Sequence, residues 1–269
     1  MAASKLKNLV IVVLLLVNVF LMILVIPAQL ESHRQTREAD AKLAVLFEEA
    51  DIEFLPDSVP QGLALRELRM TLDDRMRLTA AAAILGEGFQ KEETERGPRY
   101  TAEAGFVQFY GTRFTAKLSL PAEKPEEFSR DLLERMGLKV YDLQSEERNG
   151  TVICTVRLNA LGFPIADSPV TLSFENGHLT SMDGTFVAES ALVRVGQTDT
   201  VSARNALVVF LGSRLSTGWM GSAIHAVTQG WYISRSSGSD NILCPIWYIS
   251  TDTGDYLVNG ITQAVFIGV

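Results

Sequence analysis

An uninterrupted apolar stretch from Leu9 to Ile26 constrains this sequence more than any other feature. It carries no charge, and Asn18 is its one polar side chain. A helix rises about 1.5 Å per residue, so the stretch reaches about 27 Å, close to the roughly 30 Å hydrocarbon core of a bilayer. No second stretch of the chain approaches this length. The sequence therefore predicts one transmembrane helix.

The flanks of this stretch bear on the orientation of the chain. The tail, residues 1–8, is short and carries Lys5 and Lys7, whereas a large domain follows the stretch. Long domains translocate largely regardless of charge, so we expect a cytoplasmic tail and an extracytoplasmic domain. A cleaved signal peptide is the alternative. It is disfavoured because the stretch is long for an h-region and Ile26 is not small, so an uncleaved anchor in the cell membrane is expected.

The rest of the chain divides into a stalk and two lobes. Residues 27–62 are predicted to form a stalk helix and a linker, because apolar residues at Leu43, Leu46, Phe47 and Ala50 follow a helical period before Pro56 and Pro60. A dimeric coiled coil is the alternative for the stalk. Residues 63–122 and 123–269 are predicted to form the first and second α+β lobes. The formal net charge of -8 argues against a nucleic-acid partner.

Three predicted helices alternate with groups of predicted strands. The first helix has Thr71 as its N-cap and Gly86 as its stop. The second begins at Pro125 and ends at Gly137, and the third begins at Ser202. Strands are expected near residues 88–93, 105–110, 113–120, 223–234, 243–250, 256–259 and 264–267. Asn149-Gly150 and Asn176-Gly177 each predict a type I′ hairpin. Helices separated by antiparallel meanders indicate an α+β fold with two related lobes.

A search for catalytic or metal-binding chemistry finds little. His33, His178 and His225 are each isolated, and none has a Cys or His at metal-ligand spacing. No Walker loop, HExxH, GxSxG or GxGxxG motif is present. Cys154 and Cys244 lie in apolar, strand-like runs, which favours buried free thiols, although an extracytoplasmic address leaves a disulfide open. We expect no metal, no cofactor and no enzymatic activity.

Two residues are the best candidates for contact with a partner. All three tryptophans lie in the last third of the chain, and Trp219 stands in a loop between Gly218 and Gly221. The alternative is that the aromatic residues fill the core of the last sheet. Asn18 is the second candidate, because an Asn side chain within a membrane helix can form hydrogen bonds with another helix.

The chain resembles the YycH/YycI family, and YycI most of all. The likeness lies in the opening SKLKNLVIVVLLLVNVFL, in LGFPIADSPVTLSFENGHL and in the ending CPIWYISTDTGDYLVNGITQAV. The last two segments also look like PepSY-type repeats. The resemblance implies a bitopic protein whose transmembrane helix acts on a sensor histidine kinase that controls the cell wall, in a complex with a sister YycH-like protein.

Two other classes of function remain open. A PepSY-like module could inhibit or chaperone an enzyme of the cell envelope, and it would then work when released from its anchor. A cell-envelope hydrolase would instead lose activity when one acid or His in a pocket is changed.

Overall fold

The computed structural model describes residues 14, 38–54, 59–235 and 241–268. The chain divides into two units, Met1–Ser58 and Val59–Val269. The predicted tail, residues 1–8, and all of the predicted transmembrane helix except Leu14 lie outside the described residues. Within the described ranges, no helix combines the length and hydropathy that crossing a bilayer requires.

In the first unit, the described residues include a helix over residues 38–49. The helix ends where Asp51 adopts a left-handed conformation with φ of 56°. The amide of Ile52 then donates a hydrogen bond of 2.9 Å to the carbonyl of Phe47, which satisfies one of the last free carbonyls of the helix. The chain turns back on itself here, and the Phe47 and Phe54 ring centroids lie 4.7 Å apart.

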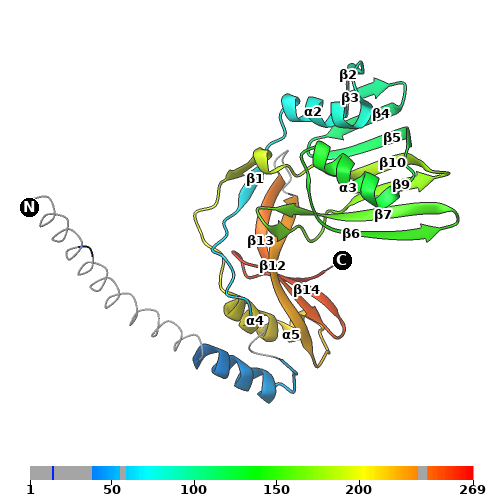
Figure 1. Ribbon diagram of the computed structural model, residues 1–269. Coiled ribbons are helices and arrows are strands. Elements are labelled where there is room, and N and C mark those ends of the chain that lie inside the picture. The colour runs from blue at the N-terminus through cyan, green and yellow to red at the C-terminus, as the bar shows by residue number, and fades with distance from the viewer. Residues whose placement is uncertain (1–13, 15–37, 55–58, 236–240, 269) are drawn as a thin grey trace, which may run out of the picture. The chain divides into compact units, whose positions relative to one another are not determined.

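The second unit contains two antiparallel sheets (Figure 1). The larger sheet has nine strands. In spatial order they are β2 (Gln90–Thr94), β3 (Gly97–Ala102), β4 (Gly105–Tyr110), β5 (Arg113–Pro121), β10 (His178–Thr185), β9 (Val170–Glu175), β7 (Thr151–Ala160) and β6 (Lys139–Arg148), with β8 (Phe163–Pro164) paired to β7.

The smaller sheet has six strands and is built around β13 (Asn241–Thr251). One side of β13 pairs along its whole length with β12 (Ile224–Arg235). The other side pairs first with β1 (Leu68–Met70) and then with β14 (Gly254–Asn259). The sheet is completed by β11 (Leu192–Arg194), next to β1, and β15 (Val265–Ile267), next to β14. A 3-10 turn, η2 (Glu189–Ala191), precedes β11.

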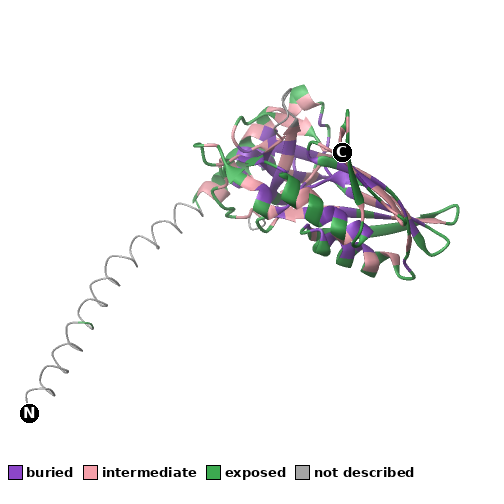
Figure 2. Cartoon of the chain, turned by 90° about the horizontal axis from the view of Figure 1, so that it is seen from above, coloured by how far each residue is buried: buried purple, intermediate pink, exposed green. Residues whose placement is uncertain are grey.

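Two helices, α2 (Asp74–Leu85) and α3 (Pro125–Arg135), cover one face of the larger sheet. Strand residues alternate between faces, so each strand contributes every second residue to the core beneath these helices. In β7, for example, Cys154, Val156 and Leu158 are fully buried, whereas Thr155 is exposed. Figure 2 shows the same contrast, with buried residues along the strands and exposed residues at the hairpin tips and outer helix faces.

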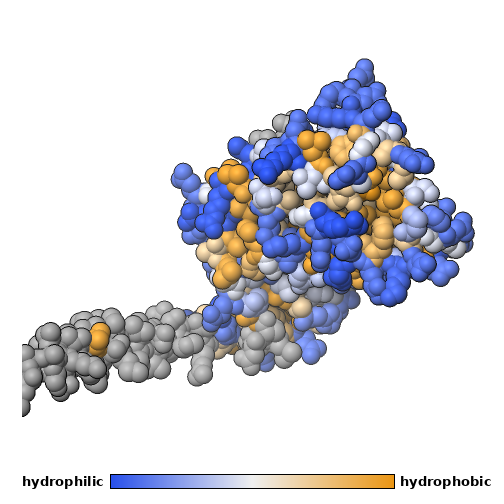
Figure 3. All heavy atoms as spheres, turned by 45° about the horizontal axis from the view of Figure 1, so that its top comes forward, coloured by the Kyte–Doolittle hydropathy of each residue, from blue (hydrophilic) through white to orange (hydrophobic). Residues whose placement is uncertain are grey.

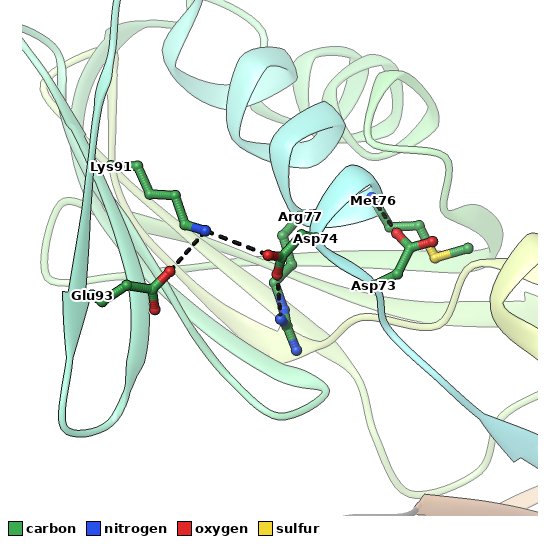
Figure 4. Close-up of polar contacts among 6 residues, drawn as sticks. All are labelled: Asp73, Asp74, Met76, Arg77, Lys91 and Glu93. Carbon is green, nitrogen blue, oxygen red and sulfur yellow. Dashed lines mark hydrogen bonds and ion pairs between the residues drawn. The ribbon is translucent and has the colours of Figure 1, made fainter.

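The helix α2 begins two residues later than the sequence indicates. Thr71 was the predicted N-cap, but this prediction is wrong, because Asp73 occupies that position and its Oδ1 accepts a hydrogen bond of 2.7 Å from the Met76 amide (Figure 4). Thr71 instead continues from β1, and its amide donates to the carbonyl of Ala191. Both residue types cap helices, so only the end of the preceding strand decides between them.

A chain of exposed ion pairs joins the first turn of α2 to the strand β2. The Asp74 carboxylate lies 2.9 Å from Arg77 and 3.5 Å from Lys91, and Lys91 lies 2.7 Å from Glu93 (Figure 4). The Arg77 hydrogen bond and the charge of Lys91 lower the pKa of Asp74. Exposed pairs of this kind contribute little to stability.

The smaller sheet packs against α4 (Ala203–Gly212) and the short α5 (Arg214–Thr217). The N-cap of α4 is Ser202, as the sequence predicts, and its hydroxyl accepts a hydrogen bond of 3.3 Å from the Asn205 amide. One hydrophobic core joins both sheets, since it includes Trp231, Ile233 and Leu243 of the smaller sheet. The Trp231 indole N–H donates a hydrogen bond of 2.8 Å to the carbonyl of Ala160 in β7.

The α+β fold with antiparallel sheets agrees with the sequence prediction. Both Asn-Gly pairs form the expected hairpins, because Asn149, Gly150, Asn176 and Gly177 all have positive φ. The predicted division between residues 122 and 123 falls just before α3. Hydrogen bonding joins β5 to β10 across that division, so the two predicted lobes do not correspond to the two sheets.

The surface of the second unit is mixed rather than uniformly polar. Figure 3 shows hydrophilic side chains over much of the visible face, with hydrophobic residues in separate patches between them.

Candidate functional site

The most distinctive surface of the second unit lies where the two sheets meet on their sides away from the helices. Two cavities adjoin there, and both are lined by Arg157 and Ala166. We call them together the Arg157 groove. The first cavity, about 220 Å³, is also lined by Asp142, Gln144, Thr155, Ile165, Asp167 and Pro169. The second, about 210 Å³, is also lined by Tyr141, Pro164, Ala226, Thr228, Gly230, Ile246, Tyr248 and Ser250.

Strand alternation explains why these side chains gather in the second cavity. On β12, Ala226, Thr228 and Gly230 share one face, and the register places them opposite Ser250, Tyr248 and Ile246 of β13 respectively. Their small side chains leave room for the cavity. At Gly230 a Cβ atom would lie 2.9 Å from the carbonyl oxygen of Pro164, so the close approach of these two segments requires glycine.

Arg157 carries the positive charge of the groove. It projects from the face of β7 opposite to the buried Val156 and is half-buried. Among the described residues that line the second cavity, it is the one with a formal charge. Asp142 stands opposite Arg157 in the β6–β7 register, but its carboxylate accepts hydrogen bonds from the Leu143 amide at 2.9 Å and the Gln144 side chain at 3.4 Å.

No carboxylate of the described part of the chain lies within ion-pair distance of the Arg157 guanidinium. An arginine presents several donors in a planar fork that matches a carboxylate. The second cavity of the groove thus offers a half-buried arginine to any anionic group that enters it, whereas Asp142 and Asp167 line the first cavity.

Tyr248 forms the opposite wall of the second cavity. Its hydroxyl donates a hydrogen bond to Asp255 Oδ2. Burial, and then the bond to Asp255, raise the pKa of Tyr248 to about 12, although the nearby charge of Arg157 acts in the opposite direction. A group that exchanges protons during catalysis needs a pKa near the working pH. The Tyr248 hydroxyl is therefore suited to holding Asp255 in place and not to proton transfer at neutral pH.

Asn18 and Trp219 are the partner-binding residues proposed from the sequence, and the structure describes only Trp219. Asn18 lies outside the described residues. The expectation that Trp219 faces outward is wrong, because its side chain is 1% exposed. Its ring centroid lies 4.7 Å from that of Phe210, and the guanidinium of Arg214 lies 5.3 Å from the centre of the indole. The flanking glycines allow the loop to fold the indole inward.

The surface around Trp219 nevertheless carries exposed apolar side chains. Leu215 is 98% exposed and Met220 is 85% exposed. Trp219 itself has a buried indole N–H without a hydrogen-bond partner. The sequence therefore indicated Trp219 as the exposed residue of this segment, whereas Leu215 and Met220 are the residues that are exposed.

The other residues considered for chemistry are scattered. His178 and His225 are exposed on different sheets, and His33 lies outside the described residues. Within the described ranges, no group of three or more His, Cys, Asp or Glu side chains could hold a metal ion. Cys154 and Cys244 are buried and free, so they form no disulfide with each other. Burial raises the pKa of the Cys244 thiol to about 12.

Sequence reasoning missed the Arg157 groove. Its signal in the sequence is an arginine within the apolar strand TVICTVRL, where alternation already places Arg157 on the face opposite to Cys154, Val156 and Leu158. What lies across from that face depends on the angle between two sheets. Residues far apart in the sequence, such as Arg157 and Thr228, meet there, and no local pattern encodes this.

Comparisons with known proteins give limited information. No family model matches the chain, and no curated protein matches it. Among solved structures it is similar to an uncharacterized protein from Eubacterium rectale, with 8% identity over 76% of this chain and 86% of that chain and a TM-score of 0.45.

Two further solved structures are similar with lower TM-scores. The C-terminal domain of YpeB from Bacillus megaterium has 11% identity over 75% of this chain and 99% of that chain, with a TM-score of 0.38. Cyanobacterial PsbP from Synechocystis has 10% identity over 52% of this chain and 100% of that chain, with a TM-score of 0.20. These values are too low to assign a fold family or a function to the chain.

Proposed function

We propose that this chain is a non-enzymatic, single-pass membrane protein whose α+β domain binds a partner protein and thereby regulates a sensor histidine kinase. The Arg157 groove is the observation that carries the binding role, because it presents an arginine without an ionic partner among the described residues. The kinase and a sister YycH-like protein are proposed as partners from the resemblance to the YycH/YycI family. The proposed location is the cell membrane, with the N-terminus in the cytoplasm and the domain outside.

Regulation through such a chain is a shift between two states of the kinase. A membrane helix can bias a bundle of helices only if it packs differently against the two states. In this proposal the residues from Leu9 to Ile26 supply that helix, with Asn18 as its polar contact. Occupation of the Arg157 groove changes how the domain is held and so changes the position of the helix.

The test measures the output of a target gene of the kinase in cells that carry the full chain at unchanged protein level. Arg157→Gln removes the charge of the groove, and Asn18→Leu removes the polar contact of the helix. We expect each substitution to change the output. Arg113→Gln is the matched control, because Arg113 is another sheet arginine, 53% exposed at its side chain and paired with Asp183 at 3.2 Å. Unchanged output for both Arg157→Gln and Asn18→Leu would refute the proposal.

One observation favours a second candidate function, an inhibitor or chaperone of a cell-envelope enzyme. Every residue that lines the Arg157 groove belongs to the unit Val59–Val269, so binding in the groove draws no side chain from the anchor. The two functions differ in whether the anchor is needed. A protease site inserted into residues 29–36 of the full chain would release the domain on demand. Kinase regulation predicts loss of function after cleavage, whereas the second candidate predicts that function persists.

A further inference from the structure

The edge strand β12 differs from the other sheet edges of the described chain. The edge strands β2 and β6 are rich in charge, with Lys91, Glu92 and Glu93 in the first and Lys139, Asp142, Glu146, Glu147 and Arg148 in the second. The edges β11 and β15 have three residues each. Short or charged edges resist pairing with another chain. By contrast β12 has 12 residues, and its part from Ile224 to Gly230 contains neither a charged residue nor proline.

The backbone of this edge is oriented for pairing. The carbonyl of Trp231 accepts a hydrogen bond of 2.8 Å from the Ala166 amide, so the polar backbone groups of Trp231 point away from β13. In an antiparallel strand, alternate residues direct their N–H and C=O groups to the same side. Val227 and Gln229 therefore direct theirs outward as well. Among the described strands, β13 is the one that β12 pairs with, apart from the isolated bridge between Ile165 and Trp231.

The Arg157 groove runs beside this same edge. Ala226 and Thr228 belong to β12 and line the second cavity together with Arg157 and Tyr141. A strand added next to Ala226–Gly230 would alternate its side chains, and every second one would point into this cavity. A carboxylate is the side chain that would pair best with Arg157, because Arg157 is the charged group among the described residues that line the second cavity.

We infer that an extended segment of a partner protein adds as a strand to the β12 edge and places an Asp or Glu side chain against Arg157. This inference deepens the binding role proposed above and rests on it. Backbone hydrogen bonds to the edge supply affinity, and the cavity around Arg157 supplies selectivity. The small residues Ala226 and Thr228 leave room for the side chains of the added strand, whereas Pro164 already fills the space over Gly230.

A second copy of this chain is a poorer occupant. Pairing of two β12 edges would present the residues IHAVTQGWYISR to the groove of the other copy. That strand contains no Asp or Glu, so it would leave Arg157 without a counter-ion. Charge complementarity therefore favours an acidic segment of a different protein.

The experiment selects ligands with a random library of nine-residue peptides displayed on phage, using the full chain in nanodiscs as the target. We expect the enriched peptides to share one Asp or Glu among β-branched or aromatic residues. Selection on Arg157→Glu should replace that acid by Lys or Arg, and selection on Arg157→Gln should lose it. Replacing the acid by its amide should weaken binding to the unchanged chain about tenfold or more, which corresponds to the loss of one charge-assisted hydrogen bond.

A second measurement tests strand addition itself. In an enriched peptide, each backbone amide is methylated in turn. Strand addition predicts that binding is lost at alternate positions, whose N–H groups face β12, and kept at the positions between them. Arg113→Glu is the control for the selection, because it reverses a charge on the larger sheet outside the groove, and it should leave the enriched sequences unchanged.

Three results would overturn the inference. The unchanged chain and both Arg157 variants could select the same peptides, or methylation could weaken binding without alternating along the peptide. The selected peptides could also resemble residues 224–231 and lack an acid. Measuring the output of the kinase's target gene in the same variants distinguishes a failure of this inference from a failure of the proposed function. If the Arg157 variants change the selected peptides, while neither they nor Asn18→Leu change the output, strand addition stands and kinase regulation fails. If Asn18→Leu changes the output while no acidic peptide is selected, strand addition fails.

Discussion

The hydroxyl of Tyr248 donates a hydrogen bond to the Asp255 carboxylate across neighbouring strands of the smaller sheet. The bond lies diagonally, since the register places Ser250 opposite Asp255 and Leu257 opposite Tyr248. A neutral tyrosine next to a carboxylate can donate, whereas a tyrosinate would repel it. The wall of the Arg157 groove therefore depends on the protonation state of one phenol.

The pH dependence of stability should reveal this bond. The pKa of Tyr248 is raised from 10.0 to about 12 in the folded chain, so only the unfolded chain loses this proton between those values. The contribution of Tyr248 to the free energy of unfolding is therefore complete below pH 10 and decreases as the pH rises towards 12. Tyr248→Phe should flatten this decrease in denaturant titrations at several pH values. The unchanged chain titrated in parallel is the reference, and equal slopes for the two chains would contradict the role of this hydrogen bond.

The start of α2 offers a direct test of the structure against the sequence. Asp73→Ala removes the side chain that accepts from the Met76 amide, and we expect a loss of about 1 kcal/mol in the free energy of unfolding. Thr71→Ala should change it by less than about 0.5 kcal/mol, because Thr71 is exposed and does not cap the helix. Urea unfolding of both variants measures the difference. A larger loss at Thr71 would mean that the helix begins earlier than the structure shows.

Local signals made most of the fold predictable from the sequence. Asn-Gly turns, a proline at the start of α3 and a serine before α4 act within a few residues, so they predict the correct elements. The strand β3 was not predicted, because Gly97-Pro98 at its start is typical of a turn. Pro98 is tolerated there at the first residues of the strand, opposite Glu93 of β2.

The candidate site could not be predicted in the same way. Arg157 and Thr228 lie on different sheets, and their proximity follows from how the sheets cross. The orientation of Trp219 depends likewise on α4, which supplies Phe210 as its neighbour. A glycine-flanked tryptophan can face either way, and only the tertiary packing decides which.

Leu161 adopts a conformation that leucine rarely takes. It forms the turn between β7 and β8 with φ of 54°, next to Gly162 with φ of 90°. A left-handed conformation costs most L-residues about 1–2 kcal/mol, and asparagine tolerates it better. Leu161→Asn should therefore raise the free energy of unfolding by about 1 kcal/mol, since the side chain is 46% exposed and buries little.

Leu215→Asn is the control for this substitution. Leu215 is 98% exposed and lies in the helix α5, so the same change of side chain relieves no backbone strain there. Urea unfolding should show a gain for Leu161→Asn and none for Leu215→Asn. Equal effects at both positions would mean that the gain comes from replacing an exposed apolar side chain by a polar one and not from the backbone.

The inward position of Trp219 can be tested through Gly221. A Cβ atom at Gly221 would lie 2.3 Å from the Trp219 Nε1 atom and 2.1 Å from the Asp252 Oδ1 atom. Gly221→Ala should therefore displace the indole and lower the free energy of unfolding by about 1–3 kcal/mol, the usual cost of overpacking. The displaced indole should also show a red-shifted fluorescence, because it moves from a buried site towards water.

Gly212→Ala provides the matched control, because nothing lies within 4 Å of a Cβ atom there and Gly212 is the last residue of α4. Alanine restricts the unfolded chain and favours a helix, so this variant should keep or gain stability, by up to about 1 kcal/mol. An outward-facing Trp219 would leave the emission spectrum of Gly221→Ala unchanged, even though the clash with Asp252 would still lower its stability. Thermal unfolding and emission spectra of the two variants thus decide directly whether the loop folds its tryptophan inward.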